Sequence, residues 1–161
     1  MKVLFVCMGN ICRSPMAEVV AREFCKQAGY SQFVFDSAGT HSHHAGERPD
    51  PRALAALVAR KYVAGNLRSR RLIEQDFGKF DWIFAMDQSN LRDLRRVCPP
   101  ELSAKVRLFL ELAPELERLD MPDPYYGSAQ GFEHVLDLCE AAAGGLLAAL
   151  ARGEVLGPAP Q

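Results

Sequence analysis

The sequence predicts a three-layer α/β fold: a four-stranded parallel sheet flanked by helices on both faces, with a cysteine-containing loop after the first strand. Short apolar runs alternate along the chain with segments of helical period, which is typical of right-handed βαβ units. The first apolar run leads directly into a cysteine, five further residues and an arginine. Ligands of such sheets bind beyond the carboxyl ends of the strands, so this loop is the first candidate for a site.

The first half of the chain supplies two strands and two helices. The apolar run before Cys7 predicts a strand at Lys2–Cys7, and Met16, Val20 and Phe24 recur at helical spacing in a helix from Pro15 to about Ala28. A second apolar run predicts a strand over residues 33–39. Pro51 suits the first position of a helix that Asp50 caps and that ends before Gly65.

The second half repeats the pattern. A buried strand is expected at residues 82–86, followed by a helix that carries Leu91, Leu94 and Val97 up to Pro99. A fourth strand is expected over residues 106–112. A turn-rich stretch, residues 113–130, then precedes a long helix that begins at Gly131.

Composition limits the class of protein. With 161 residues, of which 48% are hydrophobic, the chain suits one domain, placed at residues 1–151, and a C-terminal tail, residues 152–161, expected to be frayed. The net charge of −1 gives no general attraction to nucleic acid or to a membrane surface. No targeting segment or window of transmembrane length is expected, so a cytoplasmic location is predicted.

The loop after the first strand carries the chemistry of a nucleophile and an anion site. Thiols react as thiolates, and a helix N-terminus and a nearby cation both favour that form. Cys7 is predicted to have both. The guanidinium of Arg13 presents a planar fork of donors that matches two phosphoryl oxygens.

Other loop residues fit a tight, amide-lined turn. Gly9 and Asn10 tolerate the left-handed backbone region, so the loop can direct its N–H groups inward. Ser14 is predicted to be the N-cap of the following helix, with Pro15 at its first position. Its hydroxyl is expected to accept from the Ala17 amide and to donate to the Cys7 sulfur.

A second motif, Met121-Pro122-Asp123-Pro124-Tyr125-Tyr126-Gly127, offers a general acid. Prolines on both sides stiffen the backbone around Asp123, and its carboxyl would protonate the oxygen of a leaving group. Tyr125 and Tyr126 are expected to wall a slot for an aromatic ring.

Metal and disulfide sites are not expected. Five cysteines form no CxxC pair and are predicted to be reduced. The cluster of His41, His43 and His44 lies in a loop bounded by glycine and proline, which favours an exposed loop over a metal site.

Four motifs in the same order resemble the low-molecular-weight protein tyrosine phosphatases: V-C-M-G-N-I-C-R-S-P, D-S-A-G-T, F-D-W-I-F-A-M-D-Q-S-N-L and D-P-Y-Y-G. The resemblance implies a phosphotyrosine-containing protein substrate, inhibition by phosphate or other oxyanions, no cofactor, no metal, and a two-step reaction through a phosphocysteine. It assigns Cys7 as nucleophile, Arg13 as phosphoryl ligand and Asp123 as acid and then base. The phosphate-binding loop comprises Met8, Gly9, Asn10, Ile11, Cys12, Arg13 and Ser14, with Asn10, Ser14 and Ser37 as its hydrogen-bonded support, and His43, Tyr125 and Tyr126 face the substrate.

Two positions depart from the family pattern. Leu67 stands where relatives commonly have a histidine that braces the loop, and Asn66 is the candidate replacement. His43 stands where many relatives place an aromatic wall of the pocket.

Two other functions fit parts of the sequence. An arsenate reductase of related fold also uses a cysteine loop, but it relays oxidation through cysteines close in sequence, whereas Cys98 and Cys139 are 41 residues apart. A phosphate-binding module without turnover would not need the acid motif. Cys12 could form a protective disulfide with Cys7, or simply be a buried packing residue.

Overall fold

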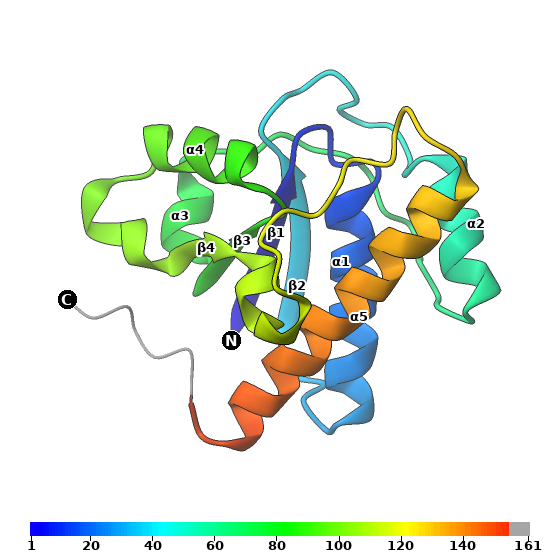
Figure 1. Ribbon diagram of the computed structural model, residues 1–161. Coiled ribbons are helices and arrows are strands. Elements are labelled where there is room, and N and C mark those ends of the chain that lie inside the picture. The colour runs from blue at the N-terminus through cyan, green and yellow to red at the C-terminus, as the bar shows by residue number, and fades with distance from the viewer. Residues whose placement is uncertain (155–161) are drawn as a thin grey trace.

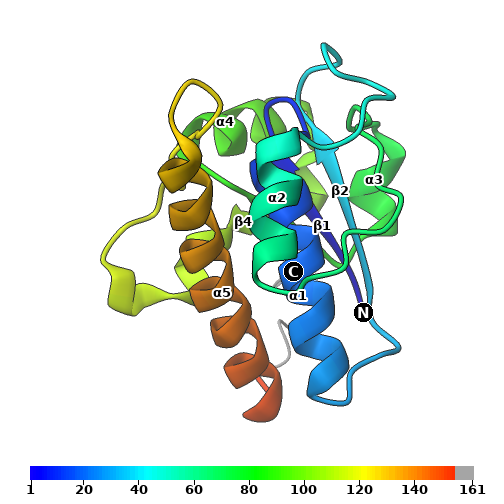
Figure 2. The same ribbon diagram turned by 90° about the vertical axis from the view of Figure 1, so that its right-hand side faces the viewer.

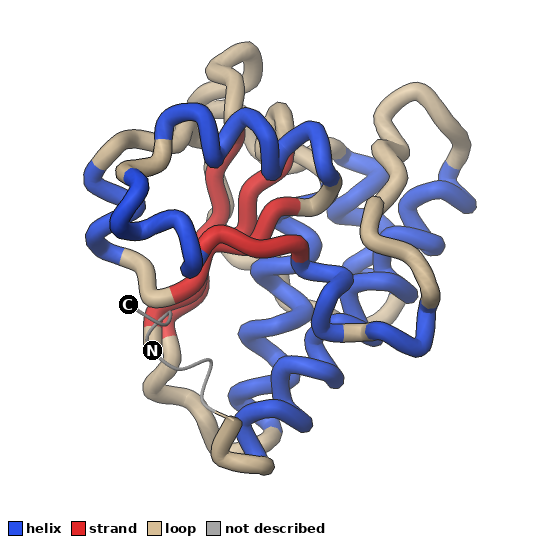
Figure 3. Tube along the Cα trace, turned by 60° about the vertical axis from the view of Figure 1, so that its left-hand side comes forward, coloured by secondary structure: helices blue, strands red, loops and turns tan. Residues whose placement is uncertain are grey.

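The computed structural model describes residues 1–154 and confirms the predicted fold class. Four parallel strands form one sheet in the order β2-β1-β3-β4. They are β1 (Lys2–Cys7), β2 (Val34–Gly39), β3 (Trp82–Ala85) and β4 (Val106–Leu108). Figure 1 shows the sheet between two groups of helices, and Figure 3 shows its strands in red at the centre.

The two faces of the sheet bury alternate residues of β1, as the two-residue period of a strand requires. Val3 and Phe5 pack beneath α1 (Arg13–Gln27), α2 (Pro51–Ala59) and α5 (Ala129–Ala151). This is the side that faces the viewer in Figure 2. Leu4 and Val6 pack beneath α3 (Gln75–Lys79) and α4 (Gln88–Val97).

The fourth strand is shorter than predicted. After Leu108 the chain enters a 3-10 helix, Phe109–Leu112, whose start is capped by Glu111: its carboxylate accepts the Leu108 N–H at 3.3 Å. Phe109 and Leu110 remain fully buried, which explains why the segment reads as a strand by hydropathy alone. The short helix α3 and two more 3-10 helices, Pro100–Lys105 and Pro114–Leu116, were not predicted.

The C-terminal helix contradicts one expectation. By length and composition α5 could cross a membrane, although no segment was expected to reach that length. Its apolar side packs against α1 instead, and Phe132, Leu136 and Leu146 are buried in the same cluster as the apolar residues of α1. Helix α5 is therefore a core helix of this domain. The predicted tail, residues 152–161, lies mostly outside the described residues.

The strand order creates a site for ligands at one edge of the sheet. From β1 the chain crosses to β2 on one side, and it later enters β3 on the other side of β1. The carboxyl ends of β1, β2 and β3 therefore open onto a shared edge at a topological switch point. The loop after β1 lies there.

Candidate active site

The loop from Cys7 to Arg13 is held by its outward-facing carbonyl groups. The carbonyls of Cys7, Met8 and Ile11 accept the backbone N–H groups of Thr40, His41 and Asp50 at 2.8–3.0 Å. Gly9 O accepts the Ser69 hydroxyl at 2.9 Å. A trans peptide points its C=O and N–H in opposite directions, so the N–H groups that follow these carbonyls turn toward the hollow of the loop. Asn10, with φ of 56°, supplies the left-handed residue that this curl requires.

A buried chain of hydrogen bonds supports the cysteine. Cys7 Sγ lies 3.0 Å from Ser14 Oγ, and the Asn10 amide donates to Ser14 Oγ at 2.8 Å and to Ser37 Oγ at 2.9 Å. The three predicted support residues are thus brought together. Ser37 in turn donates to Glu18 at 2.8 Å.

Glu18 was not predicted to belong to this network. Burial raises the pKa of Glu18, while its contacts with Arg22 and Ser37 oppose that shift. The signal in the sequence that points to Glu18 is its position four residues after Ser14, which places both side chains on the same face of α1.

The predicted capping role of Ser14 is wrong. Helix α1 begins at Arg13, with Cys12 at the cap position and no side-chain cap. The Ser14 hydroxyl is already engaged with Asn10 and Cys7, so it turns to the loop rather than to the Ala17 amide. Its expected contact with the Cys7 sulfur is present.

The missing histidine is replaced from a neighbouring position. Leu67 packs against the hydrophobic core, and Asn66 is exposed, so Asn66 does not take the bracing role suggested for it. The backbone N–H of Arg70 donates to Asn10 Oδ1 at 3.0 Å, and Ser69 holds Gly9 O. The Arg70 guanidinium is itself anchored by Asp36 and Asp76.

Arg13 lies beneath the pocket with 3% of its side chain exposed. Its Nη1 donates to Asp87 Oδ2 at 2.5 Å and to Met121 O at 3.0 Å, and its Nη2 lies 3.7 Å from Asp123 Oδ2. Burial disfavours the charge, but Cys7, Asp87 and Asp123 outweigh it and raise the pKa of Arg13. The guanidinium is therefore fixed in place and charged.

Asp87, which follows the third strand as an acidic residue of the motif F-D-W-I-F-A-M-D-Q-S-N-L, was given no role from the sequence. It also caps α4 by accepting the Asn90 N–H at 2.7 Å. Oδ1 of Asp87 caps α4, and Oδ2 binds the Arg13 guanidinium. Because Asp87 follows the end of β3, the position and orientation of the guanidinium depend on where β3 ends.

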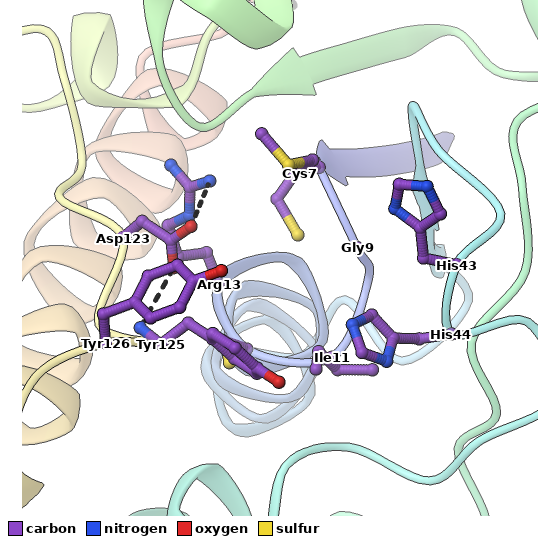
Figure 4. A pocket seen from close by; sticks show the side chains of 11 residues that line it. Cys7, Gly9, Ile11, Arg13, His43, His44, Asp123, Tyr125 and Tyr126 are labelled. Carbon is purple, nitrogen blue, oxygen red and sulfur yellow. Dashed lines mark hydrogen bonds and ion pairs between the residues drawn. The ribbon is translucent and has the colours of Figure 1, made fainter.

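The loop that carries Asp123 closes one side of the site. Asp123 Oδ1 accepts the Tyr125 N–H at 3.1 Å, and its side chain is 41% exposed. The Tyr125 and Tyr126 rings meet edge to face, with centroids 4.9 Å apart. In Figure 4 these three residues stand on one side of Cys7 and the histidines stand on the other.

These elements enclose a pocket of about 140 Å³. Eleven residues line it: Cys7, Met8, Gly9, Ile11, Cys12, Arg13, His43, His44, Asp123, Tyr125 and Tyr126. His43 is present as predicted. His44 was missed, and its ring lies 6.0 Å from that of Tyr125, so the two histidines together form the wall opposite Asp123.

The second cysteine of the loop has a different setting. Burial, with the nearby Asp50 and Cys7, raises the pKa of Cys12 to about 12. Cys12 is therefore a neutral thiol near neutral pH. All five cysteines are free, and within residues 1–154 no group of three or more metal-ligating side chains is gathered.

Fold and site together define a class of protein: an α/β domain with a cysteine at the base of an anion-binding loop, an arginine beside it and a carboxyl above it. A thiolate so placed can attack an oxyanion that the loop amides and the guanidinium hold.

Comparisons with known proteins specify the family. A family model described as low molecular weight phosphotyrosine protein phosphatase matches residues 2–155. A putative low-molecular-weight protein-tyrosine-phosphatase of Synechocystis is 44% identical over 94% of this chain and 98% of its own. The chain belongs to the low-molecular-weight phosphotyrosine protein phosphatase family.

Solved structures agree with this assignment. A protein tyrosine phosphatase of Entamoeba histolytica superposes with a TM-score of 0.92 at 38% identity, covering 96% of this chain and 99% of that chain. A Vibrio vulnificus protein in complex with benzylphosphonate superposes with a TM-score of 0.79 at 28% identity, covering 90% of this chain and 95% of that chain.

Proposed function

We propose that this protein hydrolyses phosphotyrosine in proteins, and small aryl phosphates, through a phosphocysteine. One observation carries the proposal: Asp123 comes from a segment 110 residues after Arg13, and it lines a single pocket with Cys7 and Arg13 of the phosphate-binding loop. Residues 1–151 act as one catalytic domain, and family membership supports the reaction class.

The phosphoryl group binds in the hollow of the loop. Asp87 and Met121 O hold Nη1 of Arg13, which leaves the Nε–H and Nη2 donors for two phosphoryl oxygens. The backbone N–H groups that face the hollow of the loop stabilise the remaining negative charge of the phosphoryl group. Because these donors are held before the substrate arrives, they stabilise the transition state without reorganisation, and the proposal needs no metal or cofactor.

The first step transfers the phosphoryl group to sulfur. The Cys7 thiolate attacks in line, the S–P bond forms, and the P–O bond to the phenol breaks. Asp123 donates its proton to the leaving oxygen, and the Ser14 hydroxyl, 3.0 Å from Sγ, stabilises the thiolate before attack.

The second step returns the enzyme to its starting state. Asp123, now a carboxylate, takes a proton from water while the water oxygen attacks phosphorus. The S–P bond breaks and inorganic phosphate leaves. Phosphate and similar oxyanions should therefore inhibit by occupying the same loop, which the phosphonate complex of the Vibrio relative supports.

The shape of the pocket favours tyrosine. Tyr125 and Tyr126 on one side and His43 and His44 on the other form a slot between them that suits a flat ring. A phosphoserine side chain is shorter and would leave the peptide backbone in collision with these walls. A nucleophilic thiol also requires a reducing compartment, which supports action in the cytoplasm.

An aryl phosphate assay without metal tests the proposal. Cys7→Ser should abolish turnover while leaving the fold intact, and Asp123→Ala should lower the rate by about two to four orders of magnitude on a poor leaving group. Full activity of Asp123→Ala on phenyl phosphate would remove Asp123 from the acid role.

The arsenate reductase alternative has less support. Cys98 packs on the face of the sheet opposite Cys7 and Cys139, so the sheet separates it from the other two. Release of arsenite from arsenate, with no phenol release from an aryl phosphate, would favour that alternative over hydrolysis.

A further inference from the structure

Arg52 connects the two loops of the active site without lining the pocket. It lies in the first turn of α2, whose N-cap is Asp50. The Asp50 carboxylate accepts the Arg52 backbone N–H at 2.8 Å, its Nε at 3.0 Å and its Nη2 at 2.9 Å. Asp50, which caps α2, therefore also fixes the orientation of the Arg52 guanidinium.

The guanidinium grips the segment that follows Asp123. Nη2 of Arg52 donates to Tyr125 O at 2.8 Å, and Nη1 donates to Gly127 O at 3.2 Å. Its central carbon lies 4.7 Å from the ring centroid of Phe132 in α5 and 5.7 Å from that of Tyr125. Two hydrogen bonds and two cation–ring contacts of Arg52 therefore hold the segment that follows Asp123.

The same helix start is tied to the phosphate-binding loop. The Asp50 N–H donates to Ile11 O at 2.8 Å. Cys7 and Asp123 are therefore joined through one continuous route: phosphate-binding loop, Asp50, Arg52 and the backbone at Tyr125.

On the side that precedes Asp123, the loop is anchored by Met121, whose N–H donates to Met86 O at 2.9 Å and whose carbonyl accepts Arg13 Nη1 at 3.0 Å. Arg13 Nη2 also lies 3.7 Å from Asp123 Oδ2.

The side that follows Asp123 has fewer anchors. Tyr126 is 93% exposed, and the hydrogen bond from Tyr125 N–H to Asp123 is local to the loop. The flanking prolines stiffen the segment but do not fix its distance from Cys7. Among the described residues, the hydrogen bonds that tie the backbone of residues 124–127 to another segment are those that Arg52 donates to Tyr125 O and Gly127 O.

We propose that Arg52 is a positioning residue that holds the Asp123 carboxyl over the leaving oxygen. This inference rests on the proposed function. Four of the N–H bonds of the guanidinium already serve Asp50, Tyr125 and Gly127, so Arg52 acts through the loop rather than as a ligand of the phosphoryl group.

The leaving-group dependence of kcat/KM separates positioning from other roles. Protonation by Asp123 matters most for a poor leaving group, so Arg52→Ala should lower kcat/KM for phenyl phosphate by about ten- to a hundredfold. For 4-nitrophenyl phosphate, whose phenolate leaves readily, the loss should stay below about threefold. The inhibition constant of inorganic phosphate should be unchanged, because the phosphate-binding loop is intact.

Arg60→Ala provides a matched control. Arg60 ends the same helix and also ties it to α5, through Glu133 and Asp137, but it is distant from the loop of Asp123. The Arg60→Ala variant should lower the melting temperature at least as much as Arg52→Ala does. It should leave the leaving-group dependence of kcat/KM unchanged. Arg52→Lys, which keeps a charge without the fork, should show an intermediate loss on phenyl phosphate.

The double variant Arg52→Ala/Asp123→Ala completes the design. If Arg52 acts through Asp123, it should be no slower on phenyl phosphate than Asp123→Ala alone. Equal losses on both substrates and on phosphate affinity would make Arg52 an anion ligand and overturn the inference. So would a further loss in the double variant. If Asp123→Ala itself lacked leaving-group dependence, the acid assignment in the proposed function would fail instead.

Discussion

Two adjacent glycines in α5 allow a direct test of how this helix packs. A Cβ on Gly144 would meet nothing within 4 Å, whereas one on Gly145 would lie 1.7 Å from Leu112 O and 2.7 Å from Leu112 C. Both changes to alanine gain the same helix propensity, about 1 kcal/mol. Only Gly145→Ala must push the helix away from a backbone carbonyl, which cannot rotate aside.

The expected magnitudes follow from these contacts. Gly144→Ala should raise the free energy of unfolding by about 1 kcal/mol, and the melting temperature by about 2–4 °C for a chain of this size. Overpacking costs about 1–3 kcal/mol or more, and a contact this close belongs at or above the upper end. Gly145→Ala should therefore be less stable than Gly144→Ala by at least about 2 kcal/mol.

Thermal and urea unfolding followed by circular dichroism measure both variants. Comparing the two cancels the propensity gain, because both residues lie in the interior of the same helix. Equal stabilisation by the two substitutions would mean that α5 does not pack on the 3-10 helix after β4, and the reasoning would be refuted.

Three further predictions concern the site and the cysteines. Ser69→Ala should raise the inhibition constant of phosphate about tenfold, because it frees a carbonyl of the loop. Ser103→Ala, which removes a similar 2.9 Å bond elsewhere, should have no effect. Peroxide should inactivate the enzyme through a Cys7–Cys12 disulfide that dithiothreitol reverses, as mass spectrometry can verify; a link from Cys7 to another cysteine would contradict this. Burial raises the pKa of Cys25 from 9.0 to about 11, so the unfolded chain loses this proton first. Stability should fall as pH rises across that window, and less steeply in Cys25→Ala, as urea titrations at several pH values would show; parallel slopes would contradict this.

Local patterns predicted the elements whose signals are local. Strand β1 lies at the predicted residues, because a strand buried on both faces appears as an uninterrupted apolar run. The cap of α2 by Asp50 followed in the same way from the Asp-Pro pair. The fourth strand was predicted too long, because hydropathy cannot distinguish a buried strand from a buried 3-10 turn.

The residues of the candidate site also fall into those that the sequence indicated and those that only the structure revealed. Cys7, Arg13 and Asp123 were recognisable because each lies in a motif whose residues are adjacent in the chain. Glu18, Ser69 and Arg52 lie in no such motif, and the motif that contains Asp87 does not indicate its contact with Arg13. The contacts that tie these four residues to the site span 19 to 75 residues of sequence.

The sequence by itself determined the family, the fold class and the residues that meet the phosphoryl group, since these depend on short motifs and on hydrophobic periodicity. Only the tertiary structure decided which groups hold those residues in place. Asp87 reaches Arg13 because β3 and β1 are neighbours in the sheet, and Arg52 reaches Tyr125 because α2 packs beside α5. Hydrogen bonds of this kind depend on distances of about 3 Å between remote segments, and no local pattern in the chain encodes such a distance.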